Sequence, residues 1–409
     1  MPGDGLSVSS ARAAVNGGRG CHGKKSLVCY PAPGYEPTME KNDAFEIFVV
    51  TTPGLESVLC AEMKAAGFPQ PKPVKGGVVT RGDWRQVWRA NLMLRGATRV
   101  LARIGSFRAL HLAQLDKRAR KFPWADFLRP DVPVRVDASC TNSKIYHAGA
   151  AAQRIARAIT EELGAPVTED AELVVKARID DDLCTFSIDT SGESLHKRGH
   201  KEAVNKAPMR ETLASLFLRQ CGYEGKEPVV DPMCGSGTFV IEAAEMAAGL
   251  HPGRARSFAF EKLAGFDAAA WHALRDHARS IVPDVRFYGS DRDAGAVKMS
   301  GENAERAGVA GWTDFRHHAI SDLTPPEGPP GLVIVNPPYG GRIGDTKQLY
   351  GLYGALGKVL LTRFKGWRVG IITNEPALAR VTELPFLPVS GPVLHGGIKV
   401  ALYRTNPLG

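Results

Sequence analysis

The sequence lacks the features of a membrane-spanning or exported chain. Its apolar runs fall short of the roughly 18 residues that a transmembrane helix needs, and its amino terminus has no hydrophobic core suited to export. Seven cysteines form no Cys-x-x-Cys pair and leave an odd count. We therefore predict a cytoplasmic protein with reduced cysteines, no metal and no membrane partner.

Acidic residues are outnumbered by basic ones. The 43 Asp and Glu residues stand against 52 Lys and Arg, which gives a formal net charge of +9. This excess favours a polyanionic partner such as nucleic acid, although charge alone identifies none. A chain of 409 residues that is 44% hydrophobic is long enough for two or three domains with sizeable cores.

The first 42 residues have no sustained hydrophobic periodicity and are rich in Gly, Ser, Pro and Ala. Such a composition cannot bury enough apolar surface to order itself, so we predict a disordered tail over residues 1–42. Met39 stands just before the first strand-like segment, residues 45–51, and we expect it to be the native start.

The most informative pattern is an apolar run after Pro228 that breaks at a stretch with two glycines, Asp231-Pro232-Met233-Cys234-Gly235-Ser236-Gly237-Thr238. Apolar spacing typical of a helix resumes over residues 239–247, so the order is strand, glycine-rich turn, helix. Glycine lets a ligand approach the backbone, and the start of a helix offers free N–H groups. The spacing matches neither the dinucleotide fingerprint nor a phosphate loop. It predicts a nucleotide-like ligand, with a purely structural turn as the alternative.

A second pattern ends a buried-strand segment, residues 332–335, in Asn336-Pro337-Pro338-Tyr339. Two prolines cannot continue a central strand, so the chain leaves the sheet at its carboxyl edge, where open α/β sheets bind ligands. The Asn336 side-chain oxygen and the Pro337 carbonyl can accept hydrogen bonds from an exocyclic amine, and Tyr339 offers a face for base stacking. With Pro338, these are our candidate catalytic residues. The alternative is a proline-rich structural turn.

Together, the stretches 231–238 and 336–340 resemble class I S-adenosylmethionine-dependent methyltransferases that act on base amino groups. More narrowly, residues 45–403 resemble the THUMP-domain RNA methyltransferases, and among them the bacterial 23S rRNA guanine-N2 methyltransferase family. The resemblance implies S-adenosylmethionine as the cofactor and RNA as the partner. The cofactor-binding residues that it implies at the turn are Asp231, Pro232, Cys234, Gly235, Gly237 and Thr238.

Two further acids complete the expected cofactor site. A ribose-binding carboxylate ordinarily follows the glycine turn by roughly 20 residues. Residues 250–283 resemble an insertion, so we assign the ribose contact to Asp291, at the end of the next strand pattern. The family tends to place an adenine-binding Asp where Ala319 stands, and Asp322 is our candidate to substitute for it.

Cations in two segments are candidates for RNA contact. Residues 95–192 resemble the THUMP module, which captures RNA in its family, and Lys117, Arg118 and Lys144 supply positive charge there. The linker 194–201 is the densest local cationic stretch and adds a second set of candidates, Lys197, Arg198 and Lys201. Each side chain could instead be a solvated surface residue.

The predicted fold class is α/β, with a Rossmann-like seven-stranded methyltransferase domain preceded by an α/β THUMP-containing RNA-binding region. The expected divisions are a tail (1–42), a ferredoxin-like segment (43–94), the THUMP domain (95–192) and the methyltransferase domain (193–409). The resemblance implies methyl transfer to the N2 amine of a guanine, in 23S rRNA or a large-subunit precursor. Two alternatives stay open: adenine-N6 methylation of RNA or DNA, and a noncatalytic RNA-binding assembly factor. The sequence identifies no protein partner.

Overall fold

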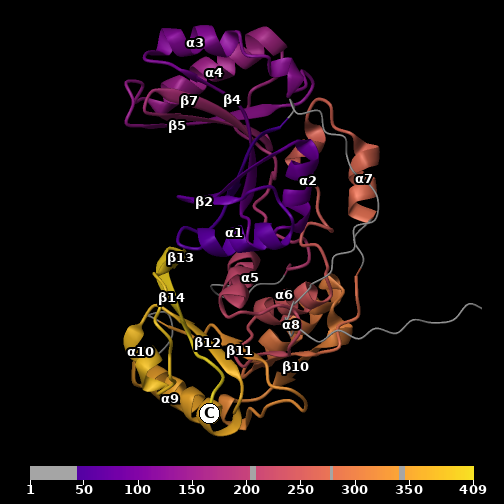
Figure 1. The fold of residues 1–409 in the computed structure, drawn as a ribbon, viewed down its shortest axis with the longest axis vertical. Coiled ribbons are helices and arrows are strands. Elements are labelled where there is room, and N and C mark those ends of the chain that lie inside the picture. Colours follow the sequence, from indigo (N-terminus) through magenta and orange to yellow (C-terminus); the bar gives the residue numbers. More distant parts are fainter. Residues whose placement is uncertain (1–43, 203–208, 277–279, 340–345) are drawn as a thin grey trace, which may run out of the picture. The chain divides into compact units, whose positions relative to one another are not determined.

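The computed structural model describes residues 44–202, 209–276, 280–339 and 346–409 (Figure 1). Both the tail predicted over residues 1–42 and Met39 lie outside the described residues. The described chain forms two seven-stranded sheets, one in its amino-terminal half and one in its carboxyl-terminal half.

The first sheet has the strand order β2-β3-β1-β4-β7-β6-β5. Its strands are β1 (Phe45–Val50), β2 (Lys72–Val74), β3 (Gly77–Gly82), β4 (Arg99–Arg108), β5 (Val134–Thr141), β6 (Leu173–Asp180) and β7 (Leu183–Asp189). Because β4 pairs with β1 on one side and with β7 on the other, the ferredoxin-like and THUMP segments share one continuous sheet.

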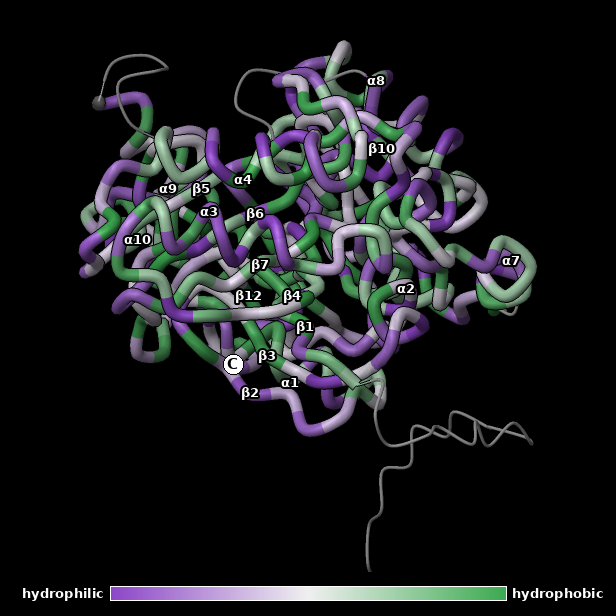
Figure 2. The backbone as a smooth tube through the Cα atoms, turned by 90° about the horizontal axis from the view of Figure 1, so that it is seen from above, coloured by the Kyte–Doolittle hydropathy of each residue, from purple (hydrophilic) through white to green (hydrophobic). Residues whose placement is uncertain are grey.

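One face of this sheet is covered by helices. They are α1 (Glu56–Ala65), α2 (Trp84–Met93), α3 (Leu112–Arg120) and α4 (Ala148–Leu163). Along β4, Val100 and Ala102 are fully buried while Leu101 and Arg103 are partly exposed, which is the period-two pattern of a half-covered sheet. Figure 2 shows the hydrophobic character of β4 and β7 at the centre of this sheet.

The second sheet has the order β10-β9-β8-β11-β12-β14-β13. Its strands are β8 (Val229–Asp231), β9 (Phe287–Asp291), β10 (Thr313–His317), β11 (Leu332–Val335), β12 (Arg368–Thr373), β13 (Val393–His395) and β14 (Ile398–Arg404). From β10 to β12 the neighbouring strands are parallel, and β14 is antiparallel to β12. The predicted Rossmann-like seven-stranded sheet is thus confirmed.

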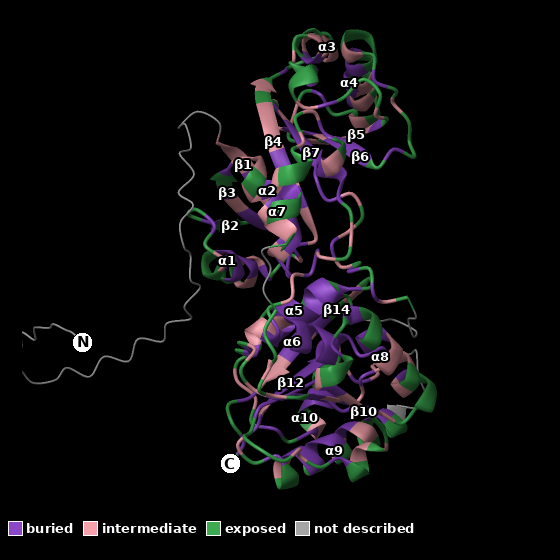
Figure 3. Ribbon diagram, turned by 90° about the vertical axis from the view of Figure 1, so that its right-hand side faces the viewer, coloured by how far each residue is buried: buried purple, intermediate pink, exposed green. Residues whose placement is uncertain are grey.

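Helices cover both faces of the second sheet. They are α5 (Glu211–Gln220), α6 (Thr238–Ala247), α8 (Ala294–Ala307), α9 (Thr346–Arg363) and α10 (Pro376–Val381), whereas α7 (Ala268–Asp276) lies beside α2. Leu332 and Ile334 of β11 share a core with α5, α6 and α8, whereas Val333 and Val335 share one with α9 and α10. The strand is apolar throughout because it is buried on both faces, as Figure 3 shows for much of this sheet.

The insertion at 250–283 packs against the first half of the chain. Trp88 of α2 lies with ring centroids 6.0 Å from Phe260, 5.7 Å from Phe266 and 6.4 Å from Trp271. α7 is described over Ala268–Asp276, and residues 277–279 lie outside the described part of the chain. The aromatic residues of the insertion are therefore core residues.

Candidate active site

The two motifs of the sequence follow neighbouring strands. β8 pairs in parallel with β11, which places Leu332 opposite Val229 and Val333 opposite Val230. Because β9 and β10 lie on one side of β8 while β11 and β12 lie on the other, the topological switch point falls between β8 and β11. Typical strand spacings put the Cα atoms of Asp231 and Asn336 about 8 Å apart. Both motifs therefore lie at the carboxyl edge of the second sheet.

The turn after β8 needs glycine at two positions. Gly235 and Gly237 have φ angles of 55° and 80°, in the left-handed region. A Cβ atom added to Gly235 would meet no heavy atom of the described residues within 4 Å, so open space adjoins its backbone. At Gly237 the added atom would lie 3.1 Å from Cβ of Ser300. The turn therefore has room for a ligand beside Gly235 and packs tightly at Gly237.

Hydrogen bonds from β9 and α8 hold the turn in place. The Gly235 N–H donates to Oδ2 of Asp291 at 3.0 Å. From α8, the Ser300 hydroxyl donates to the Gly235 carbonyl at 2.9 Å, and the Asn303 amide donates to the Ser236 carbonyl at 3.0 Å. Both side chains are fully buried, and the sequence analysis missed them. In the sequence they are only two polar residues three apart on one helix face. That pattern predicts a contact with the turn only if the buried face of the helix is known.

Asp231 is a buried acid at the end of β8. It is 2% exposed, and its Oδ1 accepts a hydrogen bond from the Met233 N–H at 3.1 Å. Burial, with a smaller contribution from the Asp291 carboxylate, raises the pKa of Asp231 to about 8. The carboxyl therefore holds a proton at neutral pH unless a positive charge lies beside it.

These features fit S-adenosylmethionine. The cofactor carries positive charge on its sulfonium and ammonium groups, which suits the buried carboxyl of Asp231. The open space beside Gly235 can admit a nucleoside, and Asp291 lies at the adjacent strand end. Asp291 already accepts from Gly235 and, at 3.0 Å, from the Asp293 N–H, but each oxygen keeps a lone pair for a ribose hydroxyl.

The other cofactor candidates support the turn in different ways. Pro232 is buried, and Cys234 donates its N–H to the Ser290 carbonyl at 2.9 Å. The Cys234 thiol lies 3.6 Å from the Ser300 hydroxyl, and burial raises its pKa, so it is a packing group rather than a nucleophile. Thr238 begins α6 and is 6% exposed.

Asp322 lies apart from this cluster along the sheet edge. It ends a short 3-10 turn, Ile320–Asp322, after β10, and its side chain is exposed. The Ser321 hydroxyl donates to it at 3.2 Å. The structure therefore places Asp322 at the carboxyl end of the strand next to β9, and its adenine contact stays a prediction.

The Asn336 side chain presents a buried and unpaired acceptor. Among the described residues, none donates a hydrogen bond to its Oδ1, although that atom is inaccessible to solvent. An acceptor left in this state costs about 1–3 kcal/mol. A substrate amine beside Asn336 would supply the missing donor.

Two side chains brace the loop after β11. The Tyr353 hydroxyl, on α9, donates to the Pro338 carbonyl at 3.4 Å. The Tyr339 hydroxyl lies 3.2 Å from Nδ1 of His395, at the end of β13, and shares a hydrogen bond with it. Burial raises the pKa of Tyr353 to about 12, so its hydroxyl remains a donor at neutral pH. The sequence analysis missed both braces because each partner is distant in the chain.

The predicted RNA-binding cations fall into two groups. Lys117, Arg118 and Lys144 are exposed on α3 and on the loop after β5, as a phosphate contact requires. Lys197 is also exposed and pairs with Glu193 at 2.6 Å. These four side chains remain candidates for RNA contact.

Arg198 and Lys201 have other environments than the sequence analysis expected. Arg198 is 2% exposed and donates to Glu242 at 3.1 Å, so the prediction that it contacts RNA is corrected to a structural role. Lys201 is largely buried beside the glycine turn, where its Nζ donates to the Thr238 hydroxyl at 2.8 Å and lies 3.3 Å from a Glu211 oxygen. A dense run of cations in a sequence does not show which of them face solvent.

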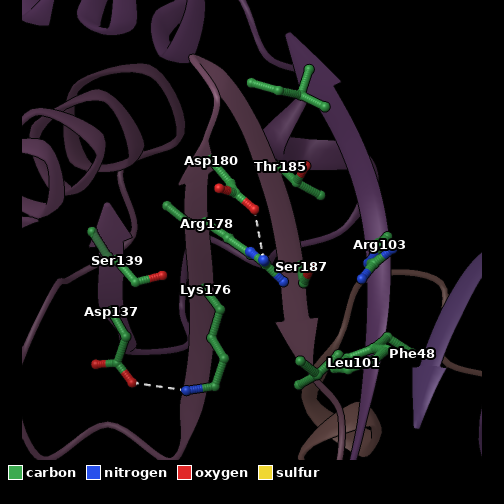
Figure 4. A pocket seen from close by; sticks show the side chains of 13 residues that line it. Phe48, Leu101, Arg103, Asp137, Ser139, Lys176, Arg178, Asp180, Thr185 and Ser187 are labelled. Atoms are coloured by element: carbon green, nitrogen blue, oxygen red, sulfur yellow. Dashed lines mark hydrogen bonds and ion pairs between the residues drawn. The ribbon is translucent and has the colours of Figure 1, made fainter. Parts of the chain in front are cut away.

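A hollow of about 500 Å³ lies on the open face of the first sheet, in the amino-terminal half (Figure 4). Its cations are paired with carboxylates: Arg103 with Glu46, Lys176 with Asp137 at 3.1 Å, and Arg178 with Asp180 at 2.7 Å. Balanced charge offers little attraction for a phosphate. The exposed cations Lys117, Arg118, Lys144 and Lys197 therefore stay the candidates for RNA contact.

Two searches of the described residues gave no candidates. In the ranges 44–202, 209–276, 280–339 and 346–409, no three His, Cys, Asp or Glu side chains gather as metal ligands would. Within the same part of the chain, no helix combines the length and apolar character needed to cross a bilayer.

The parallel sheet, the glycine turn and the Asn-Pro-Pro-Tyr loop at its switch point define a Rossmann-like methyltransferase. Three family descriptions match: an RMKL-like methyltransferase domain at residues 198–386, an RlmL ferredoxin-like domain at 46–101 and a THUMP domain at 111–189. The Synechocystis protein slr0064, named as a candidate RNA methyltransferase, is 30% identical over 87% of this chain and 95% of its own length. The chain belongs to the THUMP-domain methyltransferases with an RlmL-like methyltransferase domain, a family that uses S-adenosylmethionine.

Two further similarities concern the substrate and the cofactor. The ribosomal RNA large subunit methyltransferase K/L of Marinomonas sp. is 34% identical over 87% of this chain. The chain spans about half the length of that relative, 52%. The solved structure of SMU.472, described as a candidate methyltransferase complexed with SAH, has a TM-score of 0.80 at 27% identity. That similarity covers 90% of this chain and 99% of the other.

Proposed function

We propose that this protein transfers a methyl group from S-adenosylmethionine to the N2 amine of a guanine in 23S rRNA or its large-subunit precursor, in the cytoplasm. The observation that carries the proposal is the buried Oδ1 of Asn336, which has no partner among the described residues and lies one strand away from the glycine turn. The name of the Marinomonas relative supports a large-subunit rRNA substrate, and the THUMP match supports RNA over DNA.

The roles of the residues follow from their hydrogen-bonding groups. Asn336 Oδ1 and the Pro337 carbonyl accept from the target amine, which orients it and draws its lone pair out of ring conjugation. The cofactor supplies a methyl group that is already activated for transfer. Tyr339, fixed by His395, offers a ring face to the base. The RNA must present an unpaired or everted guanine, because the amine is unreachable within a stacked helix.

The test is methyl transfer to unmodified 23S rRNA made by transcription. Tritiated S-adenosylmethionine reports turnover, and mass spectrometry of the nucleosides should find N2-methylguanosine. Asn336→Ala should lower turnover on the order of 100-fold, with cofactor affinity unchanged, because its oxygen acts on the amine. The matched control is Asn406→Ala, at an exposed asparagine. A product of N6-methyladenosine, or no transfer by the wild type, contradicts the proposal.

For RNA capture, the exposed cations Lys117, Arg118, Lys144 and Lys197 are proposed to contact phosphates. Their combined replacement by Ala should weaken rRNA binding and reduce the slope of log K against log salt by roughly 0.7–0.9 per lost contact. Filter binding across a salt series measures this slope. Lys365→Ala, at an exposed lysine outside the cluster, should leave it unchanged. An unaltered slope in the fourfold variant would show that RNA binds elsewhere.

A further inference from the structure

A second asparagine stands beside Asn336 at the edge of the sheet. Asn374 follows β12 as Asn336 follows β11, and the two strands pair in parallel with Val335 opposite Ile371. Asn336 is thus opposite Ile372, and Asn374 lies two residues further along. In strand geometry the two Cα atoms are about 8 Å apart, and both side chains project to the same face.

Contacts from the neighbouring elements keep the two strand ends together. The Tyr353 hydroxyl, on α9, donates to the Pro338 carbonyl at 3.4 Å, and β12, which ends at Thr373, pairs with β11. Thr373 immediately precedes Asn374, and its hydroxyl accepts from the Glu375 N–H at 3.1 Å. Tyr353 thus holds the loop that follows Asn336, and Thr373 holds the turn that contains Asn374.

Asn374 shares the state that marks Asn336. Its Oδ1 is also inaccessible to solvent, and no donor among the described residues pairs with it. These two buried acceptors lie at adjacent strand ends, and each needs a hydrogen-bond donor that a ligand could supply. The ligand that fits is one with neighbouring N–H groups.

Guanine and adenine differ in whether an N–H donor lies next to the exocyclic amine. In guanine, the N2 amine lies next to the N1–H, so its edge presents adjacent donors. In adenine, the N6 amine lies between the acceptors N1 and N7. A pair of acceptors therefore matches guanine, whereas with adenine one of them would face a ring nitrogen that has no proton.

We propose that Asn374 is a specificity-determining residue that accepts a hydrogen bond from guanine N1–H while Asn336 holds the N2 amine. The inference rests on the proposed function and deepens it by assigning the choice of base to a second side chain. It also explains how guanine and adenine enzymes can share the Asn-Pro-Pro-Tyr loop and still select different bases. The residue that selects the base follows β12 and lies outside that loop.

The experiment compares the target guanine with 2-aminopurine in the same RNA. The methylated position is first mapped by mass spectrometry of rRNA fragments, and splint-ligated 23S rRNA then carries either base there. 2-Aminopurine keeps the 2-amine, but its N1 is an acceptor. The wild type should prefer guanine on the order of 100-fold in kcat/KM. Asn374→Leu, of similar volume without an acceptor, should reduce that preference to about 10-fold or less.

Asn374→Asp is the second variant, because it keeps acceptors and loses the amide donors. It should retain the preference for guanine, and both variants should bind S-adenosylmethionine as the wild type does, which shows that they fold. A guanine preference that is unchanged in Asn374→Leu overturns the inference while the proposed function stands. Absence of N2-methylguanosine in wild-type product instead overturns the proposed function itself.

Discussion

The carboxyl group of Asp231, a proposed cofactor contact, should couple cofactor binding to pH. It is 2% exposed, and burial raises its pKa to about 8, so the protein without cofactor holds a proton there at pH 7. A cationic ligand favours the ionised form, and binding at pH 7 should therefore release a proton. Affinity for S-adenosylmethionine should rise with pH up to about 8, by as much as 10-fold per unit, and level off above it.

Isothermal titration calorimetry in two buffers with different ionisation enthalpies measures this proton release. At pH 7 the wild type should release close to one proton from this carboxyl, and at pH 9 close to none. In Asp231→Asn, the amide has the shape of the carboxyl group but does not titrate. The affinity of this variant for S-adenosylmethionine should be lower and independent of pH between 6 and 8. Equal release by both proteins would assign the proton to another group.

At the residue scale, the sequence predicted the position of those residues whose placement follows from their immediate neighbours. Asp231, Gly235 and Gly237 form one local turn, so their placement beside Asn336 required only that two strands pair. Arg198 could not be predicted in the same way, because its burial depends on Glu242, 44 positions away. Local charge density indicated RNA contact, whereas tertiary packing uses Arg198 to neutralise a buried acid.

Among the elements, the β13–β14 hairpin carries His395 to the Tyr339 hydroxyl. Its two-residue turn, Gly396 and Gly397, has φ angles of 57° and 86°, as a tight hairpin of this kind requires. His395 is 7% exposed and lies 3.2 Å from Tyr339. We infer that the hairpin positions the ring on which the base stacks.

His395→Phe should therefore lower kcat on the order of 10-fold and leave cofactor affinity unchanged, because the ring of Tyr339 loses its fixed orientation. Tyr339→Phe removes the same hydrogen bond from the other side. The double variant should be no slower than the slower single variant, which is the result for two groups that act through one bond. Strictly additive losses in rRNA methylation assays would mean that the two residues act independently.

The sequence analysis did not predict β13, the partner of β14. A three-residue strand gives no alternating pattern of its own and is recognised only by its pairing with β14. β8 is equally short, but it and β11 are apolar runs next to prolines, and residues 239–247 of α6 have the apolar spacing of a helix. The elements of the proposed cofactor site were therefore predictable, whereas the hairpin that contacts Tyr339 of the proposed target-base loop was not.

Across the whole molecule, a buried charge cluster joins the amino-terminal half to the helix that begins at the glycine turn. Arg95, which follows α2, lies 3.0 Å from both Glu242 and Glu245 of α6. Arg198 of the linker and Arg254 of the insertion complete the cluster, at 3.1 Å from Glu242 and 2.5 Å from Glu245. The partners of Arg95 are 147 and 150 positions away, so no local pattern could predict it.

Arg95→Met keeps the volume of the side chain but leaves two buried carboxylates with one partner fewer. Removing one member of such a cluster costs about 3–5 kcal/mol, which should lower the calorimetric unfolding temperature by roughly 5 °C. Because α6 starts at the cofactor turn, affinity for S-adenosylmethionine should weaken as well. Arg129→Met breaks an exposed pair with Asp131 and should shift unfolding by no more than about 1 °C. If both variants unfold at the wild-type temperature, the cluster does not hold the two halves together.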